Sequence, residues 1–170
     1  AVIGLCGGTT TTAIADELTT RPDIMRSSED PGLTIVTNAI NIGMMLSTRP
    51  QIKTLLTGGL VHPRSYELIG GFAEAVMGSV SLDIAFIGAN GLDPEVGPSC
   101  HDENEAEVNA LMASRARRAV IVAHAAKIDR RAFATIGSKD LFSTVVTDDE
   151  ITPDQFRRLQ QAGYEVIVAE

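Results

Sequence analysis

Short apolar runs recur along the whole chain, and most of them are continuous rather than alternating between apolar and polar residues. Strands that are buried on both faces have this pattern, because helices cover both sides of a parallel sheet. The pattern therefore predicts seven buried strands in a mostly parallel sheet. They are residues 3–6, 34–37, 54–57, 84–87, 120–123, 144–147 and 165–168.

Apolar residues with helical spacing lie between several of these runs. Segments 12–18, 38–46 and 105–119 each place apolar side chains on one face of a helix. Three basic residues, Arg115, Arg117 and Arg118, fall near the end of the third segment, where a helix dipole favours cations. This helix is therefore predicted to continue to residue 119.

The last helix has the clearest boundaries in the sequence. Thr152 is a candidate N-cap, Pro153 stands at the first helical position, and Gln155 completes a capping box. Gly163 is expected to end this helix, and Tyr164 is expected to begin the last strand.

The alternation of strands and helices predicts the fold class. It is typical of an α/β domain with right-handed crossovers. We expect three layers, a mostly parallel sheet with helices on both faces. A length of 170 residues fits one domain over residues 1–170, at roughly 100–200 residues per domain. Segment 91–103 is the longest stretch that the sequence predicts as a loop.

The charge of the chain limits its partners. Asp and Glu outnumber Lys and Arg by 22 to 14, which gives a formal net charge of −8. Because DNA affinity depends mostly on Lys and Arg at phosphates, this chain alone is a poor candidate for DNA binding. No apolar run approaches the ~18–20 residues that cross a bilayer, so no membrane partner is expected.

The cysteines indicate the cellular compartment of the protein, and the first residues indicate whether the chain is a fragment. Cys6 and Cys100 predict free thiols, since two cysteines in a domain of this size are typical of a reducing compartment. A cytoplasmic location is expected, because the chain also lacks a basic start followed by an apolar core. The chain opens at Ala1 directly on an apolar run, so we expect a fragment with a further segment upstream.

Small, polar and glycine residues gather where the predicted strands end. In open α/β sheets, ligands bind at this edge. Turns also need Gly and Asn, so a single strand end of this kind would mean little. Their number predicts a small-molecule site. The residues concerned include Gly7, Gly8, Asn38, Gly58, Gly59, Gly88, Asn90 and Lys127.

The sharpest local motif is Gly7-Gly8-Thr9-Thr10-Thr11-Thr12, between the first strand and the first helix. Glycines let the backbone approach a ligand closely, and a helix N-terminus presents free N–H groups and a positive dipole end. The threonine hydroxyls add donors and are expected to cap the helix. The motif suits a phosphate or a carboxylate, with a capped helix after a tight turn as the alternative. It is neither a Walker A loop nor a dinucleotide fingerprint.

Two charged residues are candidates for ligand contacts near these strand ends. Lys127 lies just past a strand, where it can pair with an anion or be an ordinary surface lysine. Glu105 begins a helix, where it can stabilise the dipole or accept a hydrogen bond from a ligand hydroxyl. The Cys/His/acid run 100–103 is contiguous, which does not suit a metal site, and no Cys–His catalytic pair is supported. No metal, cofactor or catalytic residue is therefore expected.

The motifs, in their order along the chain, resemble the C-terminal effector domain of the DeoR family of bacterial sugar-catabolism repressors. The resemblance covers about residues 4–150. It rests on Gly7-Gly8-Thr9-Thr10-Thr11, Thr34-Ile35-Val36-Thr37-Asn38, Leu56-Thr57-Gly58-Gly59, Arg64-Ser65 with Glu67-Leu68 and Gly70, Asp83-Ile84-Ala85-Phe86-Ile87-Gly88-Ala89-Asn90-Gly91, Glu105-Ala106-Glu107, and Lys127 with Ala132-Phe133.

This resemblance implies a fold shared with ribose-5-phosphate isomerase and CoA transferases, and a phosphorylated sugar or polyol as effector. It also implies an upstream winged helix-turn-helix domain, absent here, through which operator DNA would be bound. Bacterial operators are often palindromic and are bound by symmetric dimers, so a homo-oligomer, a dimer or tetramer, is expected. The ligand contacts carried over by position are Gly8, Thr9, Thr10, Thr11, Thr37, Asn38, Gly58, Gly59, Gly88, Asn90, Glu105 and Lys127. Gly7, the first residue of the glycine–threonine motif, is expected to contact the ligand as well.

The chain departs from the family in the segment before Lys127. The family has an Asp and a Ser there, whereas this chain has His124-Ala125-Ala126. We expect the effector's phosphate on the amides of residues 8–11. Its sugar end is expected to extend toward Asn38, Asn90 and Lys127, whose side chains can bond hydroxyls.

An enzyme is the alternative to a sensor. A sugar-phosphate isomerase needs a carboxylate base beside the sugar carbons. Ile87 and Asn90 stand where the isomerases have acids, so that Glu105 remains without an evident partner. A CoA transferase would need an activated glutamate nucleophile, which no motif supports. The sequence therefore favours a sensor domain without catalytic activity.

Overall fold

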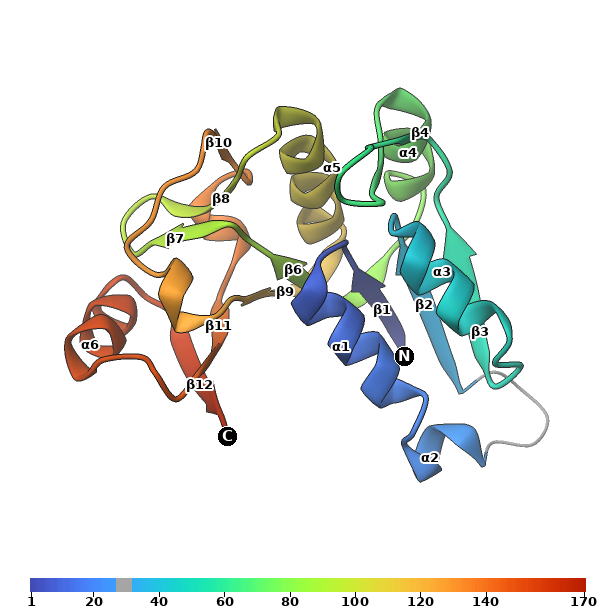
Figure 1. Cartoon of the computed structure of the whole chain (residues 1–170), viewed down its shortest axis with the longest axis horizontal. Helices are drawn as coiled ribbons and strands as arrows, with labels where there is room; N and C mark the ends of the chain where they lie inside the picture. The colour runs from blue at the N-terminus through green and yellow to red at the C-terminus, as the bar shows by residue number, and fades with distance from the viewer. Residues whose placement is uncertain (27–31) are drawn as a thin grey trace.

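The computed structural model describes residues 1–26 and 32–170. Its centre is a seven-stranded sheet, and Figure 1 shows the strands side by side in the order β12-β11-β9-β6-β1-β2-β3. Every neighbouring pair in this sheet is parallel, so the prediction of a parallel sheet is confirmed. The strands are β1 (Val2–Leu5), β2 (Leu33–Thr37), β3 (Ile52–Leu56), β6 (Leu82–Gly88), β9 (Ala116–Val122), β11 (Thr144–Asp148) and β12 (Glu165–Ala169).

Helices cover both faces of the sheet, which confirms the predicted three-layer α/β architecture. On one face, α1 (Thr9–Leu18) and α3 (Ile40–Ser47) pack over a buried cluster that includes Leu5 and Ile35. On the other face, α4 (Gly71–Met77), α5 (Glu103–Ser114) and α6 (Pro153–Gln161) pack over a second cluster that includes Ile87 and Met112. The strands read as continuous apolar runs because they supply side chains to both clusters.

The prediction that the helix after residue 105 continues to residue 119 is wrong. Helix α5 ends at Ser114, and residues from Ala116 onward form β9, which pairs with β6. Arg118 therefore lies on a strand, where its guanidinium is 3.1 Å from the carboxylate of Glu165 on β12. Arg115 ends the helix, and its Nε donates to the carbonyl of Val80 at 2.7 Å.

The capping box predicted for the last helix is confirmed. Thr152 Oγ1 accepts from the N–H of Gln155 at 3.1 Å, and the Gln155 side chain accepts from the N–H of Thr152 at 3.0 Å. Gly163 has a φ of 102°, a left-handed conformation that suits glycine after a helix. The final strand begins at Glu165, where the apolar run 165–168 predicts it, and one residue after Tyr164.

Segment 91–103 is more regular than the predicted loop. It contains β7 (Gly91–Asp93) and β8 (Gly97–Cys100), an antiparallel pair that β10 (Ala134–Thr135) extends to three strands. The sequence also does not predict α2 (Pro22–Met25) or the antiparallel pair of β4 (Leu60–Val61) and β5 (Leu68–Ile69). Elements of two to four residues are too short to show a period.

Both cysteines have free thiols, as predicted, and both are buried. Across residues 1–26 and 32–170, no helix is long and apolar enough to cross a membrane. The described residues also form two short 3₁₀ helices, η1 (Ala125–Lys127) after β9 and η2 (Lys139–Leu141) before β11.

Candidate functional site

A cavity of about 210 Å³ opens at the carboxyl ends of three neighbouring strands, β1, β6 and β9. This is the edge at which open α/β sheets bind ligands. The first turn of α1, the first turns of α5 and the segment joining β4 to β5 form its other walls. The lining residues are Gly7, Gly8, Thr9, Thr10, Thr11, Ser65, Glu67, Gly88, Ala89, Asn90, Cys100, Glu105, Asn109, Val122, Ala123, His124 and Lys127.

Nine of the thirteen ligand contacts expected from the sequence line this one cavity. They come from β1 and α1, from the end of β6, from α5 and from η1, so the fold gathers residues that are up to 120 positions apart. These residues are Gly7, Gly8, Thr9, Thr10, Thr11, Gly88, Asn90, Glu105 and Lys127.

Thr37 and Asn38, at the end of β2, lie outside the cavity lining. Both are fully buried. The hydroxyl of Thr37 donates to the carbonyl of Leu5 at 2.6 Å and accepts from the N–H of Ala39 at 3.1 Å. Asn38 Nδ2 donates to the carbonyl of Leu68 at 3.2 Å. These side chains join β2 to its neighbours, so their visible role is to hold the backbone.

Gly58 and Gly59 also lie outside the lining, in the turn between β3 and β4. Their φ angles are 74° and 126°, in the left-handed region that favours glycine. A Cβ at Gly59 would lie 2.7 Å from the carbonyl oxygen of Ile69. Gly59 therefore lets the chain pass close against β5, next to the segment that walls the cavity.

The N-terminus of α1 faces the cavity without a side-chain cap, so the predicted threonine cap is wrong. Gly8 is the N-cap residue, with a φ of 126°. The hydroxyls of Thr11 and Thr12 instead donate to the carbonyl of Gly8, at 3.2 and 2.6 Å. The first N–H groups of an α-helix have no partner within the helix. In this structure the residues of that first turn, Thr9, Thr10 and Thr11, line the cavity.

Glu67, a carboxylate that is not among the ligand contacts expected from the sequence, forms part of the cavity wall. Only 3% of its surface is exposed, and its Oε1 accepts from the N–H of Gly7 at 2.9 Å. A Cβ at Gly7 would lie 2.3 Å from Glu67 Cγ, so only glycine leaves room for this carboxylate. The available signal was an acid inside the otherwise apolar run Tyr66–Ile69, which is unusual unless the acid is functional or paired.

Glu105 lies close to Glu67 in the same wall. The hydroxyl of Ser65 donates to Glu105 Oε1 at 2.5 Å, and His62 Nδ1 lies 3.5 Å from the same oxygen. Asp102 caps α5 by accepting from the N–H of Glu105 at 3.0 Å, which fixes Glu105 in the first turn.

Burial and the nearby charge of Glu105 together raise the pKa of Glu67 to about 7, although the hydrogen bond from Gly7 opposes the shift. Two carboxyl groups that share a desolvated site cannot both be charged at low cost. The cavity therefore contains a carboxyl group that is partly protonated near neutral pH, which can donate as well as accept a hydrogen bond.

Another part of the cavity wall carries basic groups. Lys127 lies in η1, and His124 precedes that helix. His124 Nδ1 lies 3.0 Å from Asp148 Oδ2, which also accepts from the N–H of Ala125 at 3.0 Å. The backbone bonds and His124 together lower the pKa of Asp148. The segment in which the sequence departs from the DeoR family therefore places an imidazole, oriented by Asp148, in the cavity wall.

Cys100 lines the cavity, but it is not a nucleophile at neutral pH. Burial raises its pKa to about 12, and the thiolate, not the thiol, is the reactive form. Burial also raises the pKa of Cys6. Within the described part of the chain, no group of three His, Cys, Asp or Glu side chains is arranged to hold a metal ion.

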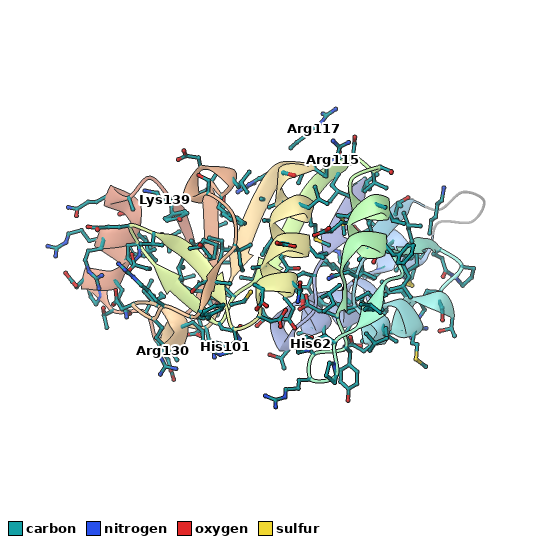
Figure 2. The ribbon with its side chains drawn as sticks, turned by 90° about the horizontal axis from the view of Figure 1, so that it is seen from above. His62, His101, Arg115, Arg117, Arg130 and Lys139 are labelled. Carbon is teal, nitrogen blue, oxygen red and sulfur yellow. The ribbon has the colours of Figure 1, made fainter. Side chains whose placement is uncertain are left out.

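A second hollow of about 430 Å³ adjoins the first and shares Ser65, Asn90 and Glu105 with it. Its outer rim carries His62 and His101, which Figure 2 shows along the same edge of the molecule. Asn90 Oδ1 accepts from the N–H of His101 at 3.1 Å, which orients the Asn90 side chain between the two hollows.

Several proteins with sequences similar to this chain are named transcriptional regulators or repressors. It is 31% identical over 153 residues to the HTH-type transcriptional regulator GlpR of Haloferax volcanii, which covers 89% of this chain and 60% of that protein. It is 28% identical over 138 residues to the HTH-type transcriptional regulator GolR of Listeria innocua, 81% of this chain and 54% of that protein. It is 26% identical over 116 residues to the glycerol-3-phosphate regulon repressor of Escherichia coli K12; the match covers 68% of this chain and 46% of that protein.

The chain thus spans about three fifths or less of the length of the relatives it matches. Among solved structures, ribose 5-phosphate isomerase from Plasmodium falciparum aligns with 75% of this chain and 44% of its own, with a TM-score of 0.49 and 14% identity. The family model described as the DeoR C terminal sensor domain matches residues 1–149. With that match over most of its length, the chain belongs to the family of DeoR C-terminal sensor domains.

Proposed function

We propose that residues 1–170 form the effector-sensing domain of a transcriptional regulator of carbohydrate metabolism, and that the effector is a phosphorylated sugar or polyol. The observation that carries this proposal is the uncapped N-terminus of α1, which opens into a cavity with Lys127 and His124 on another wall. Free helix N–H groups, a positive dipole end and a cationic side chain together favour an anion. A phosphate uses all three.

The phosphate would bind the amides of residues 8–11, where Gly8 and Thr9 are exposed. Lys127 is half-buried in η1 and adds the positive charge that a dianion requires. His124 can donate from Nε2 when it is protonated, since its Nδ1 faces Asp148. Charge-assisted hydrogen bonds of this kind are the strongest available to a small ligand.

The sugar end of the effector would extend toward Asn90 and the carboxyl groups of Glu67 and Glu105. Asn38, which the sequence analysis expected on this side, is buried against Leu68 and lies outside the cavity lining. Sugar hydroxyls both donate and accept. A wall that combines an amide, a carboxylate and a partly protonated carboxyl group offers partners for both.

Operator DNA would be bound by another part of a longer protein. The chain carries a net charge of −8, and the relatives named HTH-type regulators are considerably longer than the matched segment. An effector that favours one of two arrangements of such a protein changes its operator affinity by a coupling free energy. On this proposal the chain has no catalytic activity.

Calorimetry on matched ligand pairs tests the proposal. Glycerol 3-phosphate against glycerol, and fructose 1-phosphate against fructose, differ only in the phosphate. Loss of the phosphate removes several charge-assisted hydrogen bonds of ~1.5–3 kcal/mol each, so affinity should fall at least a hundredfold. Equal affinity within a pair that binds would show that the cavity does not recognise the phosphate.

One observation favours a second candidate function, a sugar-phosphate isomerase. Glu67, with its pKa raised to about 7, lies beside Glu105 in the cavity, and a general base works best with a pKa near the working pH. Glu105 therefore has the acidic partner that the sequence alone did not reveal. Turnover assays on sugar phosphates separate the two functions, because a sensor binds these compounds without converting them.

A further inference from the structure

Large apolar side chains are exposed at the end of the sheet formed by β3. The surface, here called the β3 end, comprises seven side chains that are 36–81% exposed. They come from α3, β3, β4, the β4–β5 connection and the start of α4; in Figure 1, α3 and β3 lie beyond β2, and β4 and α4 lie above α3. They are Met44, Leu55, Leu56, Leu60, Val61, Tyr66 and Phe72.

The β3 end is also an open sheet edge. β3 pairs with β2 on one side and ends the strand order on the other. Its exposed Leu55 and Leu56 are consecutive, so they point to opposite faces of the sheet. Leu56 faces α3, since a Cβ at Gly43 would lie 3.2 Å from its Cδ1. The apolar surface therefore continues around the edge, which natural proteins normally cover or charge.

Tyr66 provides an independent observation. Its φ is 60°, a left-handed conformation that is unfavourable for a residue with a bulky side chain. Its neighbours, Ser65 and Glu67, point into the cavity, where they bond Glu105 and Gly7. The Tyr66 side chain instead points outward and is 62% exposed. Backbone strain of this kind persists at functional positions, and tyrosine is enriched at protein interfaces.

The charge distribution indicates what covers this surface. Segment 54–61 contains no charged residue, although the chain as a whole carries −8. Two copies of an acidic chain repel one another over most of their surface, and an uncharged segment such as 54–61 avoids that repulsion where it meets its copy. A two-fold interface brings the same patch of each copy together, so an apolar patch is complementary to itself.

We propose that the β3 end is the surface through which two copies of this chain associate. Phe72, Leu60 and Tyr66 are the central contacts, because large apolar and aromatic side chains contribute most to interfaces. The segment joining β4 to β5 then has one side in the interface and the other in the cavity wall, through Ser65 and Glu67. This surface goes beyond effector binding, and its test is independent of any ligand.

The chain offers a matched control at the other end of the molecule. Phe133 is 82% exposed, almost the same as Phe72 at 81%, but it follows the charged pair Arg130 and Arg131 and lies outside the β3 end. Because both phenylalanines are exposed, neither Phe72→Glu nor Phe133→Glu removes a core contact. A general effect of an added carboxylate would appear in both variants.

Sedimentation from low micromolar to several hundred micromolar protein tests the proposal, with circular dichroism to confirm that each variant is folded. We expect the wild-type chain and Phe133→Glu to form dimers. Phe72→Glu and Leu60→Asp should each weaken the association by more than tenfold. A wild-type chain that stays monomeric over this range would overturn the proposal, and so would variants at Phe72 and Leu60 that dimerise as well as Phe133→Glu.

Discussion

The carboxyl group of Glu67 accepts a hydrogen bond from the backbone N–H of Gly7 at 2.9 Å, across 60 residues of sequence. This bond joins the segment between β4 and β5 to the loop that begins α1. Glu67 is thereby held in the cavity wall, where burial raises its pKa to about 7. The position of the helix N-terminus and the protonation of the cavity are therefore linked through one contact.

The first prediction concerns stability and pH. Because the folded state raises the pKa of Glu67 from an ordinary 4.5 to about 7, the folded protein holds a proton there that the unfolded chain has released. This contribution to stability is fully present below about pH 4.5 and is lost as the pH rises through about 7. The free energy of unfolding of the wild type should therefore fall relative to that of Glu67→Gln across this window, by at most ~1.4 kcal/mol per pH unit.

Urea unfolding of the wild type and Glu67→Gln at intervals between pH 4.5 and 8 measures this difference. Glutamine keeps an oxygen that can accept from the N–H of Gly7, so the variant should fold. Glu150→Gln, a change at an exposed carboxylate, is the control and should follow the wild type. A constant difference between Glu67→Gln and the wild type at every pH would contradict the assignment of the proton to Glu67.

The second prediction concerns the room that Gly7 leaves for Glu67. A Cβ at Gly7 would meet Glu67 Cγ at 2.3 Å, so Gly7→Ala must displace the cavity wall. Overpacking of this kind costs about 1–3 kcal/mol of stability. Gly71→Ala is a matched control, since no atom lies within 4 Å of the added Cβ. Thermal and urea unfolding should show a loss of stability for Gly7→Ala only. Equal stability changes in both variants would show that the Glu67 side chain moves aside without destabilising the protein.

The positions of the strands follow from the sequence better than those of the site. Continuous apolar runs locate all seven strands of the main sheet, because burial on both faces leaves a simple pattern. The end of α5 does not follow from the sequence, because segment 115–119 contains only Ala and Arg, which favour a helix. Its pairing with β6 places it in β9, and that pairing is a contact distant in sequence.

The cavity depends on the order of the strands, which the sequence does not reveal. Strands β1, β6 and β9 are neighbours, so the residues at their ends share one cavity, whereas Thr37 at the end of β2 turns its hydroxyl toward Leu5. Glu67 reaches Gly7 across 60 residues, and Ser65 reaches Glu105 across 40. No local pattern contains such contacts, which is why the sequence left Glu105 without an acidic partner.

The third prediction concerns Thr10 in the first turn of α1. Thr10→Val removes a hydroxyl from the wall next to the free N–H groups while it keeps the shape of the side chain. If the phosphate binds there, affinity for the phosphorylated ligand should fall about tenfold, the equivalent of ~1.4 kcal/mol. Affinity for the unphosphorylated ligand should stay nearly unchanged in calorimetry. An equal loss for both ligands would show that the hydroxyl does not contact the phosphate.

The fourth prediction concerns Lys127 as the cation of the site. Lys127→Met keeps most of the apolar length of the side chain and removes its charge, so binding of the phosphorylated ligand should weaken by tenfold or more. Lys139→Met is the control, because Lys139 lies over the ring of Tyr164 and does not line the cavity. Figure 2 shows it well away from His62 and His101. If the two variants bind the phosphorylated ligand with similar affinity, Lys127 does not contact the phosphate.

The last prediction separates a sensor from an isomerase. An isomerase must move a proton between two sugar carbons, and a carboxylate free to approach them has to do so. Glu105 accepts a hydrogen bond from Ser65 at 2.5 Å and lies 3.5 Å from His62, while Glu67 is held by Gly7. Both carboxyl groups are thus held in fixed positions by the surrounding wall, and we expect no turnover of ribose 5-phosphate or of the common hexose phosphates in coupled assays. Turnover at ~1–10³ s⁻¹ that Glu105→Gln abolishes would instead identify an enzyme that uses this carboxyl pair.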